Sequence, residues 1–395
     1  MADRDAYIVS ACRTAIGEFL GGLASMTATQ LGAVAVRESV TRAGVDPKDV
    51  DEVLMGNVVQ AGVGQAPARQ AAIHGGIPDS VPATTVNKVC GSGLKAVMLA
   101  AQAIRAGDAD VIVAGGMESM SNGPYYLPKA RSGYRLGHGE LVDAVVHDGL
   151  WCAFMDRHMG GSAEFIARKY NATREDQDRF SVESHQKAVK AQKEGKFKEE
   201  VVPVLVPQRK GEPKCFCVDE RPRADTSLET LGKLKPAFEK DGTVTAGNAP
   251  GLNDGASAVV VMSGEALRRT GLKPMARVTG YAAGGVSPEM IFYAPVVAVR
   301  KLAQKMGRKP NEWDLIEANE AFAAQAIVDA RELEWDMARV NVHGGAVALG
   351  HPIGASGARI LTTLLYAMRD RRAKTGLATL CLGGGNAVAL AVEAA

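Results

Sequence analysis

Apolar residues in the first third of the chain follow a strand pattern, then a helix pattern, then a strand pattern again. Residues 53–59 and 111–114 are almost wholly apolar, which is typical of strands that are buried on both faces. Between them, residues 93–105 place apolar side chains at three- and four-residue spacing, and alanine fills most other positions. A helix that is apolar almost all round is a central one. The pattern therefore predicts a buried helix flanked by buried strands.

The same pattern returns, in the same order, in the last third of the chain. A second apolar helix is predicted over about 356–371, and the cations at its end suit the negative end of the helix dipole. The matching pairs of segments are 51–57 with 313–319, 34–37 with 297–300, and 110–116 with 377–384. Two similar β-α-β units that arose by chance are the alternative, but ordered matches at nearly equal spacing favour a duplication.

Each half alternates strand, helix, strand, helix, strand, which predicts an α/β fold with mainly parallel sheets covered by helices. The halves are predicted at 1–118 and 251–395. Residues 119–250 match neither half, so we expect an inserted loop domain, whose last stretch at 243–248 returns to the first sheet. The lysines spaced between 187 and 198 are typical of a solvated helix face rather than a binding patch.

Composition and charge exclude several classes of protein. The chain is 46% hydrophobic with a net charge of +2, which excludes intrinsic disorder. No apolar run approaches the length of a membrane span, and so balanced a charge does not attract nucleic acid. Neither a secretory signal nor a peroxisomal tripeptide is recognised, so a cytoplasmic protein with reduced thiols is expected. Glycine is in excess, at 44 of 395 residues, about 11% against a usual level of about 7%.

The first candidate for chemistry is Cys90, in the sequence Asn-Lys-Val-Cys-Gly-Ser-Gly over 87–93. A strand-like run ends there and the buried helix begins, so the thiol is expected at a helix N-terminus, where the dipole favours the thiolate. The neighbouring glycines are expected to leave room for a substrate above the sulfur. An inert buried cysteine is the alternative. Zinc is not expected, because Cys215 and Cys217 are separated by one residue only.

Glycine-rich segments in the second half hold further polar residues. His351 precedes the second apolar helix, at the place equivalent to Cys90, within a 17-residue segment that contains five glycines. Cys381 ends the last buried strand and is followed by Gly383–Gly385, and Asn319 follows another buried strand. Because ligands bind outside the carboxyl ends of strands in such sheets, we expect these segments to meet at one cleft between the halves. The glycines there predict room for a bound substrate.

Together, these segments resemble the thiolase family. The matching motifs are Asn87–Gly93, Asn319–Phe322, Gly350–Gly357 and Cys381–Gly385. The match runs essentially end to end, and four ordered motifs are far more specific than any single glycine motif. The resemblance implies a thiolase-like fold, in which two duplicated halves form a layered α/β/α/β/α core with an inserted loop domain.

The same resemblance implies that the catalytic residues are Cys90, His351, Cys381 and Asn319. Cys90 would take the acyl group from a thioester, His351 would accept the thiol proton, and Cys381 would move a proton at the α-carbon. One oxyanion hole would use His351 with a water held by Asn319, and the other would use the backbone N–H groups of Cys90 and Gly383. No metal and no cofactor are implied, because coenzyme A is a substrate or product.

The resemblance also implies a reaction and a set of binding residues. It favours transfer of acetyl between two coenzyme A thioesters in lipid metabolism, giving or cleaving acetoacetyl-CoA; a broader 3-ketoacyl-CoA thiolase of fatty-acid degradation is the alternative. The implied partners are acyl-CoA, CoA and further copies of the chain, as a dimer or tetramer. Binding of the acyl-CoA is assigned to His158, Met159, Arg223, Thr230, Phe238, Ala246, Ala321 and Phe322. For Arg223, a solvated loop cation is an equal alternative.

Three departures from the family pattern bear on acyl length and affinity rather than on reaction type. Pro250 replaces a serine common in the short-chain branch, residues 291–295 stand where many members have Met-Gly-x-Gly-Pro, and His343 replaces a frequent asparagine. Among other classes, Cys381 argues against a decarboxylating condensing enzyme. The segment Gly62–Pro67 lacks the third glycine and the acidic residue of a nicotinamide-dependent oxidoreductase. A non-catalytic acyl-carrier module would not need two cysteines and a histidine together.

Overall fold

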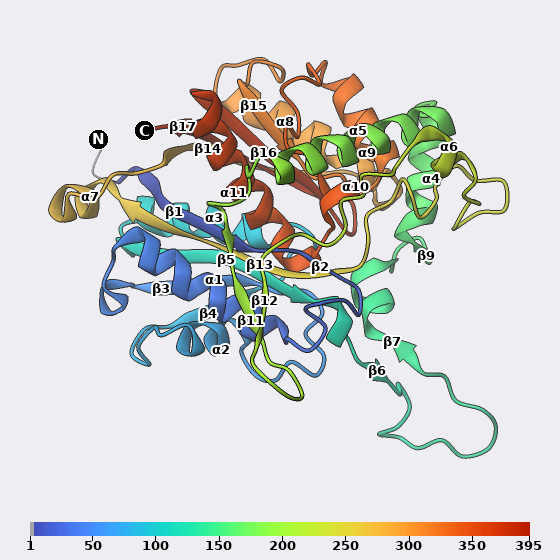
Figure 1. The fold of residues 1–395 in the computed structure, drawn as a ribbon, viewed down its shortest axis with the longest axis horizontal. Coiled ribbons are helices and arrows are strands. Elements are labelled where there is room, and N and C mark those ends of the chain that lie inside the picture. Colours follow the sequence, from blue (N-terminus) through green and yellow to red (C-terminus); the bar gives the residue numbers. More distant parts are fainter. Residues whose placement is uncertain (1–3) are drawn as a thin grey trace.

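The computed structural model describes residues 4–395, and its first half alternates strands and helices (Figure 1). The strands are β1 (Ala6–Thr14), β3 (Glu52–Gly56), β4 (Ala83–Val86), β5 (Val111–Ser119) and, after a long excursion, β13 (Asn253–Ser263). The helices between them are α1 (Ala28–Ala43), α2 (Pro67–His74) and α3 (Ser92–Ala106). The buried helix that the sequence predicts over residues 93–105 is therefore α3.

The second half repeats this succession. Its strands are β14 (Ala276–Gly285), β15 (Leu315–Ala318), β16 (Thr375–Leu382) and β17 (Asn386–Ala394), and its helices are α8 (Ala294–Lys305), α9 (Ala323–Glu332) and α11 (Ile353–Arg371). The counterpart of β4 is a single bridge, where Val340 pairs with Ile316 of β15. The three pairs of matching sequence segments lie on β3 and β15, on α1 and α8, and on β5 and β16.

The strands of both halves join in the order β15-β16-β17-β14-β1-β13-β5-β3-β4. The junction between the halves is short, because β1 and β14 pair only through Tyr7 with Arg277 and Ile8 with Ala276. Two small strands lie off this path: β2 (Gly17–Glu18) pairs with β13, and β10 (Val201–Val202) pairs with β1. Counted outward from the junction, the corresponding strands of the two halves therefore follow in the same order.

The sheet is mixed rather than mainly parallel. β3, β4 and β5 are parallel to one another, as the sequence predicts, but β13 is antiparallel to both β1 and β5. Likewise β17 is antiparallel to β14 and β16. It is antiparallel to β16 because the turn at Gly383–Gly385, which joins the two strands, is too short for a crossover. The strand that returns from the inserted segment is β13; residues 243–248, which we expected to return, form a loop that packs on Glu164 and Asp178.

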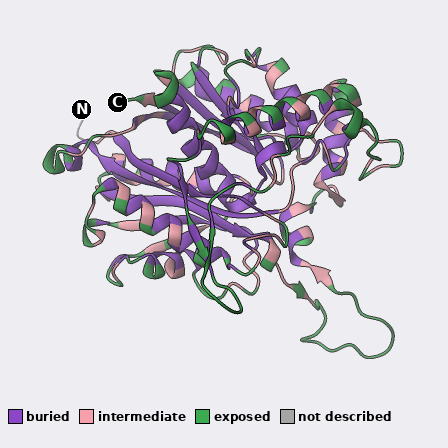
Figure 2. Cartoon of the chain, in the orientation of Figure 1, coloured by how far each residue is buried: buried purple, intermediate pink, exposed green. Residues whose placement is uncertain are grey.

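Helices α3 and α11 form the middle layer between the two halves of the sheet (Figures 1 and 2). Their apolar side chains join those of β1, β5, β13, β16 and β17 in one buried cluster, and every residue of α11 from Ile353 to Met368 is buried. The two helices begin in close contact, because a Cβ on Gly93 would lie 2.8 Å from the Ala358 nitrogen and one on Gly357 would meet the Leu94 nitrogen. Helices α1 and α2 cover the outer face of the first half, and α8 packs on the outer face of the second.

Gly116→Ala is expected to destabilise the protein by about 1–3 kcal/mol, because overpacking of a close backbone contact costs that much. A Cβ on Gly116 of β5 would overlap the carbonyl oxygen of Gly354 at the start of α11. Gly232→Ala is the matched control, since nothing lies within 4 Å of the added Cβ and the residue is helical. Urea unfolding measures the difference, and equal stabilities of the two variants would contradict this account of the packing.

The inserted segment consists of helices and hairpins. Its helices are α4 (Met159–Lys169), α5 (Arg174–Lys193) and α6 (Leu228–Gly232), and its hairpins pair β6 (Tyr125–Tyr126) with β7 (Val142–Asp143), β8 (Trp151–Cys152) with β9 (Arg157–His158), and β11 (Val204–Val206) with β12 (Lys214–Phe216). The loop between β6 and β7 extends away from the body (Figure 1). Within the described residues, no helix is both long enough and apolar enough to cross a membrane.

Candidate active site

Cys90 lies in a tight turn between β4 and α3. Val89 before it has a left-handed backbone with φ of 46°, which is rare for a β-branched residue and marks a strained position. The hydroxyl of Ser92 holds the turn, because it donates to the Val89 carbonyl at 2.6 Å and accepts from the Lys88 amide at 2.9 Å. This geometry presents the Cys90 side chain, half-buried, to a cavity.

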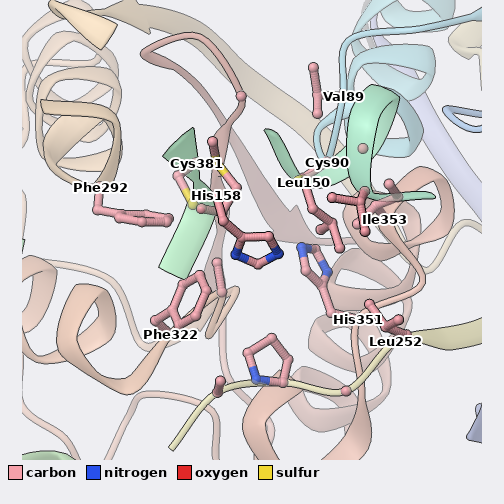
Figure 3. Close-up of a pocket in the computed structure, with 18 of the residues that line it drawn as sticks. Val89, Cys90, Leu150, His158, Leu252, Phe292, Phe322, His351, Ile353 and Cys381 are labelled. Carbon is pink, nitrogen blue, oxygen red and sulfur yellow. The ribbon is translucent and has the colours of Figure 1, made fainter. Parts of the chain in front are cut away.

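The cavity has a volume of about 350 Å³ and brings together the three reactive residues that the sequence singles out. Cys90 enters it from the turn before α3, His351 from the turn before α11, and Cys381 from the end of β16 (Figure 3). The rest of the wall is mostly apolar, and includes Leu252, Phe292 and Phe322. The expected cleft between the halves therefore exists, and the two thiols share it with the imidazole of His351.

The environment of His351 determines which of its nitrogens is free to accept a proton. Ser356 Oγ donates to the Pro352 carbonyl at 2.9 Å and lies 2.6 Å from His351 Nδ1, so it must accept the Nδ1 proton. Burial, with the Arg359 cation adding to it, lowers the pKa of His351 to about 3. The ring is therefore neutral at pH 7 and keeps its lone pair on Nε2.

The two cysteines are both thiols rather than thiolates. Burial raises the pKa of Cys90 to about 12, although the amides of Cys90 and Gly383 point at its sulfur and act against the rise. The expectation that the helix dipole favours a Cys90 thiolate is thus wrong, because desolvation outweighs the dipole. For Cys381, burial and the neighbouring Cys90 and Asp329 raise the pKa well above its usual value. A base must remove a proton before either sulfur reacts.

Asn319 follows β15 and lies beside the imidazole. Its Nδ2 is 3.5 Å from His351 Nε2, and its backbone N–H donates to the Thr379 carbonyl at 3.0 Å, which fixes it against β16. Its side-chain oxygen has no hydrogen-bond partner within residues 4–395. Asn319 is fully buried, so an amide is held next to the free nitrogen of the base.

Most of the residues assigned to acyl-CoA binding line the cavity. They are His158, Met159, Phe238, Ala246, Ala321 and Phe322. The His158 ring stacks on Phe238 at 4.8 Å, and Phe322 meets Phe292 edge to face at 5.3 Å, so an aromatic cluster closes one side. The departure at residues 291–295 accordingly places Ile291 and Phe292 in the wall, and Pro250 lies there too.

Arg223 and Thr230 lie outside this cavity, in a second and more polar hollow. That hollow also contains His185 and Arg221, and Ala246 belongs to both spaces. The Arg223 side chain is exposed and forms an ion pair with Glu18 at 3.8 Å. The Thr230 hydroxyl is engaged in capping α6, since it donates to the Ser227 carbonyl at 2.9 Å and accepts from the Ser227 amide.

Asn253 orients the base, but the sequence does not reveal it. The sequence also associates His343 with the acyl pocket, although His343 lies outside it. Asn253 at the start of β13 accepts from the His351 amide at 2.8 Å and donates to the Gly17 carbonyl at 2.9 Å. Nothing in its local sequence distinguishes it, because its role depends on a contact across 98 residues. His343, by contrast, packs edge to face on Phe197 away from the cavity, and burial lowers its pKa to about 4.

Comparison with family models gives the affiliation of the chain. A model described as "Thiolase, N-terminal domain" matches residues 6–265, and one described as "Thiolase, C-terminal domain" matches residues 272–394. The chain belongs to the thiolase family.

This thiolase is similar over nearly its whole length to proteins named acetyl-CoA acetyltransferase. It is 58% identical over 387 residues to the acetyl-CoA acetyltransferase of Pseudomonas aeruginosa, with 98% of both chains covered. It is 54% identical over 391 residues to that of Escherichia coli, with 99% of both covered. The crystal structure of the Bacillus anthracis acetyl-CoA acetyltransferase matches it with a TM-score of 0.97 at 43% identity, over 99% of both chains. The predicted family and thiolase-like fold are confirmed, and the protein is an acyltransferase.

Proposed function

We propose that this thiolase is an acetyl-CoA C-acetyltransferase, which condenses two acetyl-CoA molecules reversibly to acetoacetyl-CoA and CoA. The observation that carries the proposal is the meeting of the Cys90 and Cys381 thiols with the neutral imidazole of His351 in a single apolar cavity. One thiol can hold an acyl group while the other remains free for proton transfer at carbon. The names of the relatives that share half or more of its sequence favour acetyl as the group transferred.

In the first half-reaction, His351 Nε2 takes the proton of Cys90 as the sulfur attacks the thioester carbonyl. The amides of Cys90 and Gly383, which already point at the sulfur, bind the oxygen that becomes negative. The carbon–sulfur bond to coenzyme A then breaks, and the proton returns from His351 to the departing thiol. Cys90 is left as an acetyl thioester and His351 is neutral again.

In the second half-reaction, the Cys381 thiol first gives its proton to His351 Nε2, and the resulting Cys381 thiolate removes a proton from the methyl group of a second acetyl-CoA. The resulting carbanion attacks the acetyl carbonyl on Cys90, acetoacetyl-CoA forms as the carbon–sulfur bond to Cys90 breaks, and the departing sulfur takes the proton back from His351. Whenever His351 carries a proton, its Nε2–H is a donor, and with a water bound by Asn319 it forms the second oxyanion hole. No step requires a metal or a cofactor, since coenzyme A enters and leaves as part of the substrates.

We assign the acyl-CoA path to the two adjoining hollows. The nucleotide end would lie by Arg221 and Arg223, where positive charge favours phosphate, and the pantetheine arm would pass Ala246 toward Cys90. The apolar wall suits an acyl chain and the arm. Thr230 contributes the shape of the hollow rather than a free hydroxyl, because α6 capping already uses its hydrogen-bonding groups.

Thiolysis of 3-ketoacyl-CoA substrates of increasing chain length tests the acetyl assignment. We expect the highest kcat/KM for acetoacetyl-CoA and a steep fall as the chain lengthens, because the aromatic cluster closes the cavity. A preference for long chains would contradict the assignment and support the broader 3-ketoacyl-CoA thiolase.

Phe292→Ala is expected to relax this selectivity, because Phe292 is buried in the wall beside Phe322. The ratio of kcat/KM for a six-carbon substrate to that for acetoacetyl-CoA should rise about tenfold or more, since a few methylene-sized contacts discriminate by that much. Phe19→Ala, at an exposed aromatic residue outside the cavity, is the control. An unchanged ratio in Phe292→Ala would remove Phe292 as the limit on chain length.

We propose further that the protein is a cytoplasmic homotetramer. The loop between β6 and β7 supports an assembly, because it carries exposed apolar side chains well away from the body, among them Leu127, Leu136 and Leu141. Leu136→Asp is expected to lower the mass measured by sedimentation, with activity per chain retained. A monomeric mass for the unaltered protein would contradict the proposal.

A further inference from the structure

Glu118 is a buried carboxyl group, and the half-reactions proposed above give it no part. It is the second-to-last residue of β5, has no exposed surface, and accepts hydrogen bonds at both oxygens. Oε1 accepts from Asn57 Nδ2 at 2.8 Å and from the Val59 amide at 3.2 Å, and Oε2 accepts from the Val58 amide at 3.1 Å and the Gly354 amide at 2.9 Å.

The donors belong to two segments that hold the reacting groups. Gly354 is in the first turn of α11, three residues after His351, so Glu118 ties this turn to the first half of the fold, as Asn253 ties the His351 amide. The turn at 57–59 supports the nucleophile segment from the other side, because Asn87 Nδ2 donates to the Val58 carbonyl at 3.4 Å. One carboxylate therefore fixes the start of the helix behind His351 and the support of the turn that carries Cys90.

The backbone around Glu118 is packed too closely for another residue type to replace this link easily. A Cβ on Gly354 would lie 2.7 Å from Glu118 Oε2 and 2.6 Å from the Met117 carbonyl oxygen. Val59, Ile353 and the partly buried Cys90 also share one small apolar cluster. The carboxylate is closely packed, so a change at Glu118 should displace the two turns that it contacts.

We propose that Glu118 is a positioning residue for acyl transfer. It fixes the position of the His351 imidazole, which comes from the second half of the fold, relative to the Cys90 thiol, which comes from the first. The inference rests on the proposed roles of those two residues. Glu118 touches neither the cavity nor a substrate, and it acts through the Gly354 amide and the 57–59 turn.

The charge of Glu118 should affect the rate at which the Cys90 thiol is alkylated, and a purely structural role would not change this rate. Burial raises the pKa of Glu118 to about 7, with the three backbone amides acting against the rise and Asp254 adding to it. The same carboxylate raises the pKa of the Cys90 thiol. The other titratable groups in the cavity with Cys90 are Cys381, His158 and His351, and burial lowers the pKa of both histidines. Above pH 7, the ionised Glu118 should therefore slow reaction of Cys90 with an alkylating agent, and below pH 6 it should not.

Three variants separate position from charge. Glu118→Gln keeps the shape, removes the charge and turns an N–H group toward N–H donors. Its acetyl-transfer kcat should fall about 100-fold, the usual result of an ångström-scale misplacement, with little change in KM. At pH 8, alkylation of Cys90 by iodoacetamide, read from the mass of its peptide, should become up to about tenfold faster, as a shift of one pKa unit would give. At pH 6, the two rates should converge.

Glu118→Asp keeps the charge but moves the carboxylate oxygens away from their hydrogen-bond donors. The rate of acetyl transfer should therefore fall, while the rate of Cys90 alkylation stays that of the unaltered protein. Glu164→Gln is the matched control, because Glu164 is also a buried carboxylate that accepts from two amides and a hydroxyl, but it makes no contribution at Cys90. It should leave the alkylation rate unchanged at both pH values.

Full acetyl transfer in Glu118→Gln, or an alkylation rate at pH 8 that matches the unaltered protein, would overturn the proposal. A failure of this proposal can be distinguished from a failure of the proposed function. If the unaltered protein transferred no acetyl group, the function would fail, whereas alkylation needs only the thiol and would still report on Glu118.

Discussion

Cys90→Ser is expected to abolish acetyl transfer, with a fall in kcat of roughly 10⁴- to 10⁶-fold, the range seen when a covalent nucleophile is removed. The serine hydroxyl fits the turn before α3, so the fold and the cavity should remain. It is, however, far less acidic than a thiol, and the burial that already raises the pKa of the thiol to about 12 would penalise an alkoxide more strongly. The neutral His351 cannot compensate for this difference.

The measurement is the rate of acetoacetyl-CoA thiolysis together with labelling of the protein by acetyl-CoA. Cys12→Ser provides the control, because Cys12 is a buried thiol in β1 that donates to the Ala35 carbonyl at 3.3 Å, and a hydroxyl can make the same bond. Cys12→Ser should keep its activity. Labelling of Cys90→Ser at one acetyl group per chain would remove Cys90 as the nucleophile.

Cys381→Ala is expected to separate the two half-reactions. Acylation of Cys90 should proceed within a few-fold of its normal rate, because His351 and the amides of Cys90 and Gly383 are untouched. Carbon–carbon bond formation should fall about 10²- to 10⁴-fold, the usual contribution of one general base. Cys381 lies at the end of β16, in the wall of the cavity, and is only 2% exposed. This position explains why no other base substitutes for it.

Two measurements on this variant are sufficient. Release of a fixed amount of free CoA in a burst reports acylation. Exchange of the methyl protons of acetyl-CoA with solvent deuterium reports proton removal at carbon. The burst should survive and the exchange should disappear. Exchange at an unaltered rate in Cys381→Ala would assign the proton transfer to another group.

The architecture was largely accessible from sequence because the chain repeats itself. Apolar periodicity identified α3 and α11, and the ordered matches identified the corresponding elements of the two halves. The antiparallel strands β13 and β17 were missed, because direction depends on how the chain returns and not on local composition. The division at residues 118 and 250 stays a prediction.

Physical details of the site were less accessible. The cavity residues Cys90, His351 and Cys381 follow recognisable glycine-rich motifs, but Asn253 and Glu118 reach them through contacts that are distant in sequence. The protonation of Cys90 was misjudged because the dipole can be inferred from a sequence, whereas desolvation depends on the final packing. The prediction that the glycines leave room for a substrate is also wrong in part, because Gly93, Gly354 and Gly357 serve contacts between backbones.

The central claim is that the acyl group rests on Cys90. The most direct test is the peptide mass spectrum of the unaltered protein, quenched in acid after mixing with acetyl-CoA. The account predicts one acetyl group on the peptide that contains Cys90 and an unmodified peptide around Cys381, and the acetyl group should disappear when free CoA is added before the quench. An acetyl group on Cys381, or none on Cys90, would contradict it.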